Sequence, residues 1–158
     1  YLGPICGSII TEAADAGLFS ETFKERYAKR IKTLSTTVMS NYLEMPFNRD
    51  YELVQCVEGN EGDARVLWLI INAVIERAAK LTAANLTSTI LKSGSGTDPR
   101  KPVCINADGT TLYKTDYLLE YTNFYLHHYL QRKYKRYYRF VRIDDSPTIG
   151  SAVAALGL

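Results

Sequence analysis

The stretch Pro102-Val-Cys-Ile-Asn-Ala-Asp-Gly-Thr-Thr-Leu-Tyr-Lys114 decides the fold class of this chain. Its segment Val103-Cys-Ile105 predicts a buried β-strand, because apolar and β-branched side chains suit a pleated surface. Asp108-Gly109 then predicts a tight turn, since glycine takes positive φ without strain and an aspartate can bond backbone amides two residues on. Thr110 to Tyr113 resumes an extended pattern. A turn at the carboxyl edge of a sheet is where α/β proteins tend to bind ligands, although a plain hairpin gives the same signal.

Length and composition are those of an ordinary globular protein. The 158 residues are 46% hydrophobic and 23% charged, which is enough for one domain with its own core. The net charge of +2 is too small to indicate a nucleic-acid or membrane partner by itself. Cys6, Cys56 and Cys104 show no metal-ligand spacing, and we expect reduced, buried thiols in a cytoplasmic protein. No apolar run is long enough to cross a bilayer.

Helical periodicity predicts most of the chain before the strand. Apolar residues recur at helical spacing over 3–18. Ser20 is a natural N-cap for a short second helix, and a third spans 36–43. The longest helix covers 63–92, with Asp63 as its N-cap and a wide apolar stripe that indicates a core-facing surface.

Beyond the turn, the pattern predicts a helix, a strand and a last helix. The helix covers 115–130 and the strand 138–143. The last helix covers 146–156, with Ser146 as N-cap and Pro147 at the first helical position, where its missing donor does no harm. Two strands separated by a helix predict a right-handed βαβ crossover with helices on both faces of the sheet.

The string Asp108-Gly-Thr-Thr-Leu-Tyr-Lys114 resembles the Asp-Gly-Thr-Leu-Tyr-Lys signature of the hexokinase and glucokinase family, with one Thr inserted. Three further stretches are similar to that family in the same order. They are Tyr1-Leu2-Gly3, the Arg-Ala-Ala-containing segment Glu76 to Leu81, and the acidic, Gly-containing turn before an Ala-rich helix at 144–152. The resemblance covers nearly the whole chain.

The fold that this resemblance implies is α/β: the C-terminal half of an actin-like ATPase lobe, related to ribonuclease H, mostly helical with a few strands. We expect residues 1–158 to be a single fragment, the C-terminal portion of a hexokinase large domain. The function implied is ATP-dependent phosphorylation of the 6-hydroxyl of glucose or a similar hexose.

Catalysis in this family relies on parts that the sequence does not contain. An Asp acts as general base on the sugar hydroxyl, and a Gly-rich hairpin with Mg²⁺ positions the phosphates. We therefore assign no catalytic residue and no metal ligand, and we expect the fragment alone to be inactive. ATP and Mg²⁺ are expected to be held mainly by parts outside this chain, which supplies the adenosine side of the cleft.

Three segments are candidates for that nucleotide site. The hydroxyl-rich junction after Lys32 matches a family segment that contributes to it, although helix capping explains the same residues. The turn after the strand is the second. At the third, Ser146-Pro147-Thr148 replaces the family's Gly-Ser-Gly, and a helix start offers free amides to a ligand or simply caps itself. The candidates are Thr33, Ser35, Thr36, Thr37, Asp108, Gly109, Ser146, Pro147, Thr148, Gly150 and Ser151.

Two other functions remain open. The altered Ser146-Pro147 turn fits a catalytically inactive, hexokinase-like sugar sensor or binding module. Aromatic residues interleaved with cations over 125–142 fit an RNA-binding module, but a solvated helix end explains them as well. We favour a hexose and ATP as partners and expect neither nucleic acid nor a membrane. The sequence leaves the oligomeric state open.

Overall fold

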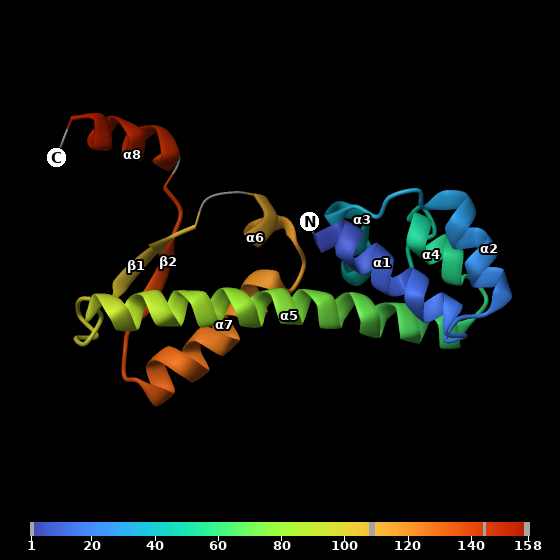
Figure 1. The fold of residues 1–158 in the computed structure, drawn as a ribbon, viewed down its shortest axis with the longest axis horizontal. Helices are drawn as coiled ribbons and strands as arrows, with labels where there is room; N and C mark the ends of the chain where they lie inside the picture. Colours follow the sequence, from blue (N-terminus) through green and yellow to red (C-terminus); the bar gives the residue numbers. More distant parts are fainter. Residues whose placement is uncertain (1, 108–109, 144, 157–158) are drawn as a thin grey trace.

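The computed structural model describes residues 2–107, 110–143 and 145–156, and one long helix organises it. This helix, α5 (Glu61–Ser93), has 33 residues and runs along most of the molecule (Figure 1). Its N-terminal half carries four helices, α1 (Leu2–Asp15), α2 (Glu21–Arg30), α3 (Thr36–Glu44) and α4 (Glu52–Val57). The elements that follow it are β1 (Val103–Asn106), α6 (Thr110–Lys114), α7 (Leu118–Leu126), the π-helix η1 (His127–Lys133), β2 (Tyr138–Val141) and α8 (Ser146–Ala155). None of the described helices is long and apolar enough to cross a membrane.

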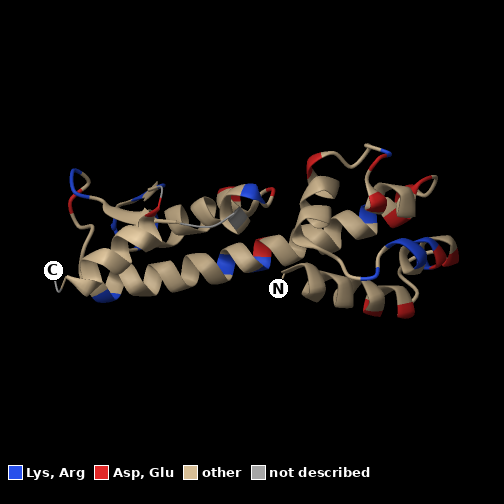
Figure 2. Cartoon of the chain, turned by 90° about the horizontal axis from the view of Figure 1, so that it is seen from above, with Lys and Arg blue, Asp and Glu red and all other residues tan. Residues whose placement is uncertain are grey.

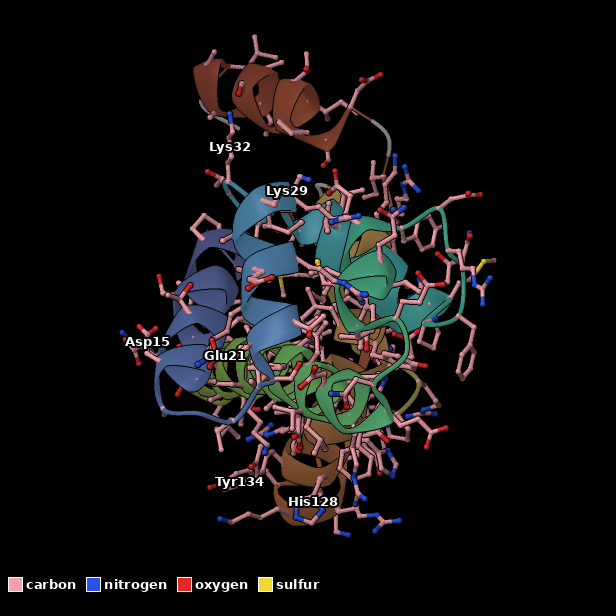
Figure 3. The ribbon with its side chains drawn as sticks, turned by 90° about the vertical axis from the view of Figure 1, so that its right-hand side faces the viewer. Asp15, Glu21, Lys29, Lys32, His128 and Tyr134 are labelled. Carbon is pink, nitrogen blue, oxygen red and sulfur yellow. The ribbon has the colours of Figure 1, made fainter. Side chains whose placement is uncertain are left out.

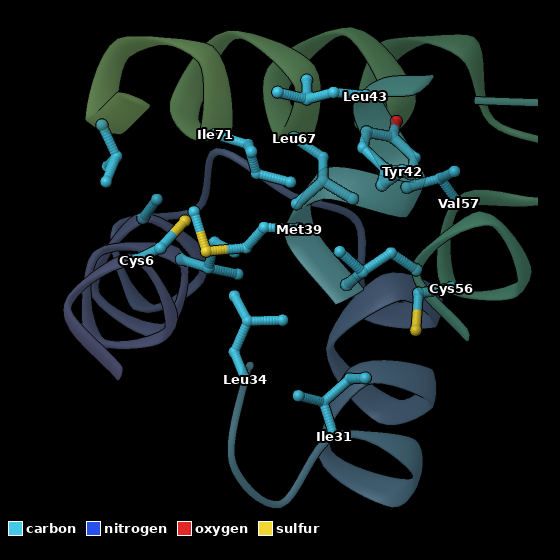
Figure 4. Packing of buried hydrophobic residues seen from close by; sticks show 14 of the residues in the cluster. Cys6, Ile31, Leu34, Met39, Tyr42, Leu43, Cys56, Val57, Leu67 and Ile71 are labelled. Atoms are coloured by element: carbon cyan, nitrogen blue, oxygen red, sulfur yellow. The ribbon is translucent and has the colours of Figure 1, made fainter. Parts of the chain in front are cut away.

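The larger hydrophobic core lies between α1, α2, α3, α4 and the N-terminal half of α5 (Figure 4). Met39 of α3 is fully buried in it beside Leu67 and Ile71 of α5. The Tyr42 hydroxyl donates to the Ala64 carbonyl at 2.9 Å, so the polar atom of this buried ring has a partner. The core-facing stripe predicted on the long helix is confirmed at Leu67, Val74 and Ile90, but its inclusion of Leu69 and Leu81 is wrong, because both side chains are exposed.

A smaller core lies where β1, β2, α7 and η1 meet the C-terminal half of α5. The two strands are parallel, with Val103 opposite Tyr138 and Ile105 opposite Phe140. These four side chains pack against the core. Because side chains alternate along a strand, Cys104 lies on the other face and is exposed. The parallel pairing is confirmed, but β1 is half-buried, so the prediction of a buried strand and of a buried Cys104 thiol is wrong.

Side chains that accept backbone amides begin three of the helices. The hydroxyl oxygen of Ser20 accepts the Phe23 amide at 3.2 Å, which confirms the predicted cap of α2. Ser35 caps α3 in the same way through the Val38 amide. The long helix begins earlier than predicted, because its N-cap is Asn60, whose side chain accepts the Asp63 amide at 3.1 Å. The prediction of Asp63 as N-cap is therefore wrong. Its carboxylate instead accepts hydrogen bonds from Ser20.

Several short elements also differ from the prediction. The segment Thr110–Lys114 is a helix instead of an extended arm, and its Leu112 packs against the larger core. Tertiary packing has overridden a weak local preference. The sequence does not predict the six-residue α4, because fewer than two turns are too short to show a periodicity. The last helix has Asp145 as its N-cap, with φ of 57°, so Ser146 is its first helical residue and not its cap.

Candidate functional site

The junction between α2 and α3 lines a pocket of about 450 Å³. Lys32 and Thr33 belong to the junction, and Figure 3 shows the Lys32 side chain projecting beyond the helices. Ser8 and Thr11 of α1 also line the pocket, and each donates its hydroxyl hydrogen to a carbonyl of its own helix, at 3.2 and 3.0 Å. Their oxygens still have lone pairs free to accept a hydrogen bond from a ligand.

Two glycines of α1 let that helix approach the junction closely, and one of them, Gly7, lines this pocket. A Cβ on Gly3 would lie 2.3 Å from the Leu34 carbonyl oxygen, and one on Gly7 would lie 3.3 Å from the Leu34 Cβ. Helix α1 therefore approaches the junction to backbone contact at Gly3. Glycine allows such an approach because it has no side chain. The close contact holds Thr33 and Ser35 in a fixed place relative to α1.

Tyr27 of α2 lines the same pocket from the opposite helix. Burial raises the pKa of Tyr27 to about 12, with smaller contributions from Cys6 and Cys56. Its hydroxyl is therefore neutral over the physiological range and can both donate and accept a hydrogen bond. The pocket thus combines neutral hydroxyls with one lysine, Lys32, and one carboxylate, Glu12.

A second, smaller pocket of about 110 Å³ lies where the start of α3 meets α6. It is lined by Thr36 and Thr37 at the first turn of α3, and by Thr111, Lys114 and Thr115. The first amides of a helix have no partner within the helix, and the helix dipole favours negative charge there. With Lys114 beside this helix start, the pocket suits an anionic group.

Ser40 connects these two segments. Its hydroxyl donates to the Lys114 carbonyl at 3.2 Å and accepts the Asp116 amide at 2.8 Å. Because Ser40 is buried on α3, these bonds fix the end of α6 against that helix. The position of Lys114 relative to Thr36 therefore depends on a contact between residues about 75 positions apart in the sequence.

An acidic pocket of about 230 Å³ adjoins this connection, lined by Glu44, Asp116 and Glu120 among others. Burial, and then repulsion by Glu44 and Glu120, raise the pKa of Asp116 above its ordinary value. Among the residues that the structure describes, no group of three or more His, Cys, Asp or Glu side chains is placed to hold a metal ion.

Of the three predicted segments, the structure places only the junction after Lys32 at the two pockets. Thr33 lines the larger pocket, Ser35 caps α3, and Thr36 and Thr37 line the smaller pocket with α6. Asp108 and Gly109 lie outside the described residues.

The third segment, on α8, is not part of either pocket. No residue of α8 is buried, and Figure 1 shows this helix apart from α1 and α3. Ser151 donates only to the Pro147 carbonyl of its own helix, at 2.8 Å. A Cβ on Gly150 would meet no atom within 4 Å. The described contacts therefore do not join Ser146, Pro147, Thr148, Gly150 and Ser151 to the junction.

Most residues that line the two pockets were not predicted from the sequence, among them Tyr27 in the larger pocket and Thr111, Lys114 and Thr115 in the smaller one. Lys114 ends the string on which the fold class was first inferred, so the signal was present but had been interpreted as strand and turn. Tyr27 had no local signal, since its role follows from how α2 packs on α1.

The paired pockets, with hydroxyls and a lysine at a helix start, define a class of site that suits a polar ligand with an anionic group. A family model described as hexokinase matches residues 1–157, and the chain belongs to the hexokinase family. Membership supports sugar phosphorylation in general. No curated protein matches the chain, and neither does any solved structure.

Proposed function

We propose that the intact protein transfers a phosphoryl group from ATP to the 6-hydroxyl of a hexose such as glucose, and that this chain binds the adenosine side of ATP. The observation that carries the proposal is the position of Thr33 in the larger pocket of a hexokinase-family chain. A volume of about 450 Å³ lies in the range of small-molecule sites.

The two pockets would bind different parts of the nucleotide. The Thr33 hydroxyl would hydrogen-bond a polar edge of the nucleoside. Lys114 and the amides of Thr36 and Thr37 favour an anionic group, because a helix start and an ammonium both attract negative charge. These groups bind and orient a nucleotide, and orientation is a large part of phosphoryl-transfer catalysis.

Mg²⁺, when bound, neutralises charge on the transferring phosphates. The described residues contain no cluster suited to hold it. We therefore place Mg²⁺ with the ATP phosphates and with residues outside this chain, together with the base that accepts the sugar hydroxyl's proton. The contribution of this chain is positioning.

The fold that fits this role is the C-terminal half of an actin-like ATPase lobe. The parallel pairing of β1 and β2 across α6, α7 and η1 supports it. The free state of Cys6, Cys56 and Cys104 supports a reducing compartment, and we place the protein in the cytoplasm.

The altered turn at Ser146 to Thr148 supports a second candidate function, a catalytically inactive sugar sensor or binding module. The exposure of α8 and its separation from both pockets favour this candidate, because the family's matching turn lies against the adenosine of ATP.

One experiment separates the two functions. ADP release by the intact protein is measured with and without glucose, and glucose and ATP binding are measured separately by calorimetry. Glucose-dependent ADP release supports the kinase. Glucose binding without turnover and without ATP binding supports the sensor. If the protein binds neither glucose nor ATP, both proposals are contradicted.

A further inference from the structure

Positive charge is concentrated at the end of the molecule where α5 and η1 terminate. Two segments build this end, 91–103 and 127–139. They contain eight basic residues and one acidic residue, Asp98, which forms a salt bridge with Arg100 at 2.9 Å. The colouring of Figure 2 shows acidic residues gathered at the opposite end of the molecule.

The two segments are held side by side by hydrogen bonds. Arg136 donates to the carbonyls of Gly94 and Ser95 at 2.9 and 3.3 Å, and the Tyr137 amide donates to the Gly96 carbonyl at 2.8 Å. Lys135, directly before Arg136, has φ of 51°, which turns the chain sharply after η1. The cations at this end are therefore displayed on a fixed scaffold.

Most of these cations have no carboxylate partner. Within the described part of the chain, no salt bridge involves Lys92, Lys101, Arg132, Lys133 or Lys135, and all five are exposed. We name these five residues, together with Tyr134, the basic end. Tyr134 is 43% exposed, and the Lys133 ammonium lies 5.2 Å from the centre of its ring.

We propose that the basic end binds single-stranded nucleic acid. Unpaired cations attract a phosphate backbone, and an exposed tyrosine among them offers a face on which a base can stack. The apolar side chains of the same segments, Leu91, Val103 and Leu130, pack in or against the smaller core, so they do not present an apolar face to a membrane or to the core of a protein interface.

This surface is separate from the candidate nucleotide site. The basic end adjoins the amino ends of β1 and β2, whereas the strands lead from their carboxyl ends to α6 and α8. The proposal does not depend on the kinase proposal, and it revises the expectation that nucleic acid is not a partner.

The test uses a fluorescein-labelled 20-mer of poly(U). Its binding to the intact protein is measured by fluorescence anisotropy at a series of salt concentrations. The double variant Lys133→Glu, Lys135→Glu is expected to weaken binding at least tenfold. It should also make the negative slope of log affinity against log salt shallower by about 1.4, which is about 0.7 for each lost phosphate contact. The matched control is Lys29→Glu, an exposed cation of α2, which lies at the opposite end of the molecule (Figure 1); this variant should change affinity less than twofold.

Substitutions of Tyr134 distinguish binding by base stacking from binding by charge alone. Tyr134→Ala is expected to weaken poly(U) binding at least fivefold without changing the salt slope, and Tyr134→Phe should restore it. Circular dichroism checks that each variant is folded. Equal binding of poly-glutamate or of vesicles containing 30% phosphatidylserine, with poly(U) binding insensitive to Tyr134→Ala, would overturn the proposal. So would the absence of poly(U) binding at low salt.

Discussion

Asp63 of α5 and Ser20 at the N-cap of α2 are joined by two hydrogen bonds across 43 residues of sequence. One carboxylate oxygen accepts the Ser20 amide at 2.9 Å, and the other accepts its hydroxyl at 2.5 Å. Ser20 in turn caps α2 through the Phe23 amide. Asp63 thus fixes the first turn of α2 to the first turn of the long helix, and so helps to position the junction that follows α2.

Replacing Asp63→Ala should lower the free energy of unfolding by about 2 to 3 kcal/mol, because the partly buried amide and hydroxyl of Ser20 lose a buried, charged acceptor. Urea denaturation measures the change. The control is Asp15→Ala, an exposed carboxylate on α1 (Figure 3), for which a change within about 0.5 kcal/mol is expected. Equal losses for the two variants would show that the Asp63 contact does not stabilise the fold.

Gly3→Ala should destabilise the protein by about 1 to 3 kcal/mol, because the new methyl group would overlap the backbone of Leu34 and Ser35. Thermal unfolding monitored by circular dichroism checks this. Gly150→Ala is the comparison, since this helical glycine has open space around it, and alanine there should be neutral or stabilising by up to about 1 kcal/mol. If both variants lose stability equally, close approach of α1 to the junction is not the cause.

Much of the helical framework could be predicted from the sequence, because its signals are local. The apolar stripe of α5 and the hydroxyls of Ser20 and Ser35 each act within a few residues. The choice of Asn60 over Asp63 as N-cap could not be predicted, because Asp63 is drawn to a partner far away in sequence. Long-range packing decides such positions.

In the candidate site, too, some residues could be predicted from the sequence, whereas others are placed by long-range packing. Thr33, Thr36 and Thr37 were identified from the family resemblance, and they lie at pockets. Lys114 joins them because α6 is a helix held by Ser40, which the extended pattern of Thr110 to Tyr113 did not suggest. The residues of α8 are separated from these pockets, and no local pattern in the sequence indicates where an exposed helix lies.

Only one of the three cysteines should react rapidly in the native protein. Burial raises the pKa of Cys6 to about 12 and that of Cys56 to about 11, which keeps both as protonated, inaccessible thiols. Cys104 is exposed on the open face of β1. Titration with Ellman's reagent at pH 8 should show one fast thiol, and Cys104→Ser should remove it while Cys6→Ser leaves it. Two or more thiols with equal rates in native protein would contradict this structure.

Asp116→Asn should raise the melting temperature at pH 7. The pKa of Asp116 is raised by burial and by Glu44 and Glu120, so the folded state favours its protonated form. That contribution to stability is present below the unfolded pKa of about 3.9 and is lost as the pH rises through the folded value. The gain from Asp116→Asn should therefore vanish near pH 3.

Glu44→Gln should give a smaller gain in the same direction, because it removes one of the repelling charges. Asp50→Asn, at an exposed carboxylate, is the control for loss of charge alone. A gain for Asp116→Asn that is the same at pH 3 and pH 7 would show that its ionisation is not responsible.

The measurement that tests the central claim most directly is the steady-state kinetics of the intact protein carrying Thr33→Val, with Thr22→Val on the exposed face of α2 as the matched control. If Thr33 binds the adenosine side of ATP, the KM for ATP should rise about threefold to tenfold, while kcat and the KM for the hexose stay unchanged. Thr22→Val should match the unmodified enzyme. An unchanged KM for ATP in Thr33→Val, or a change confined to the KM for the hexose, would contradict the proposal.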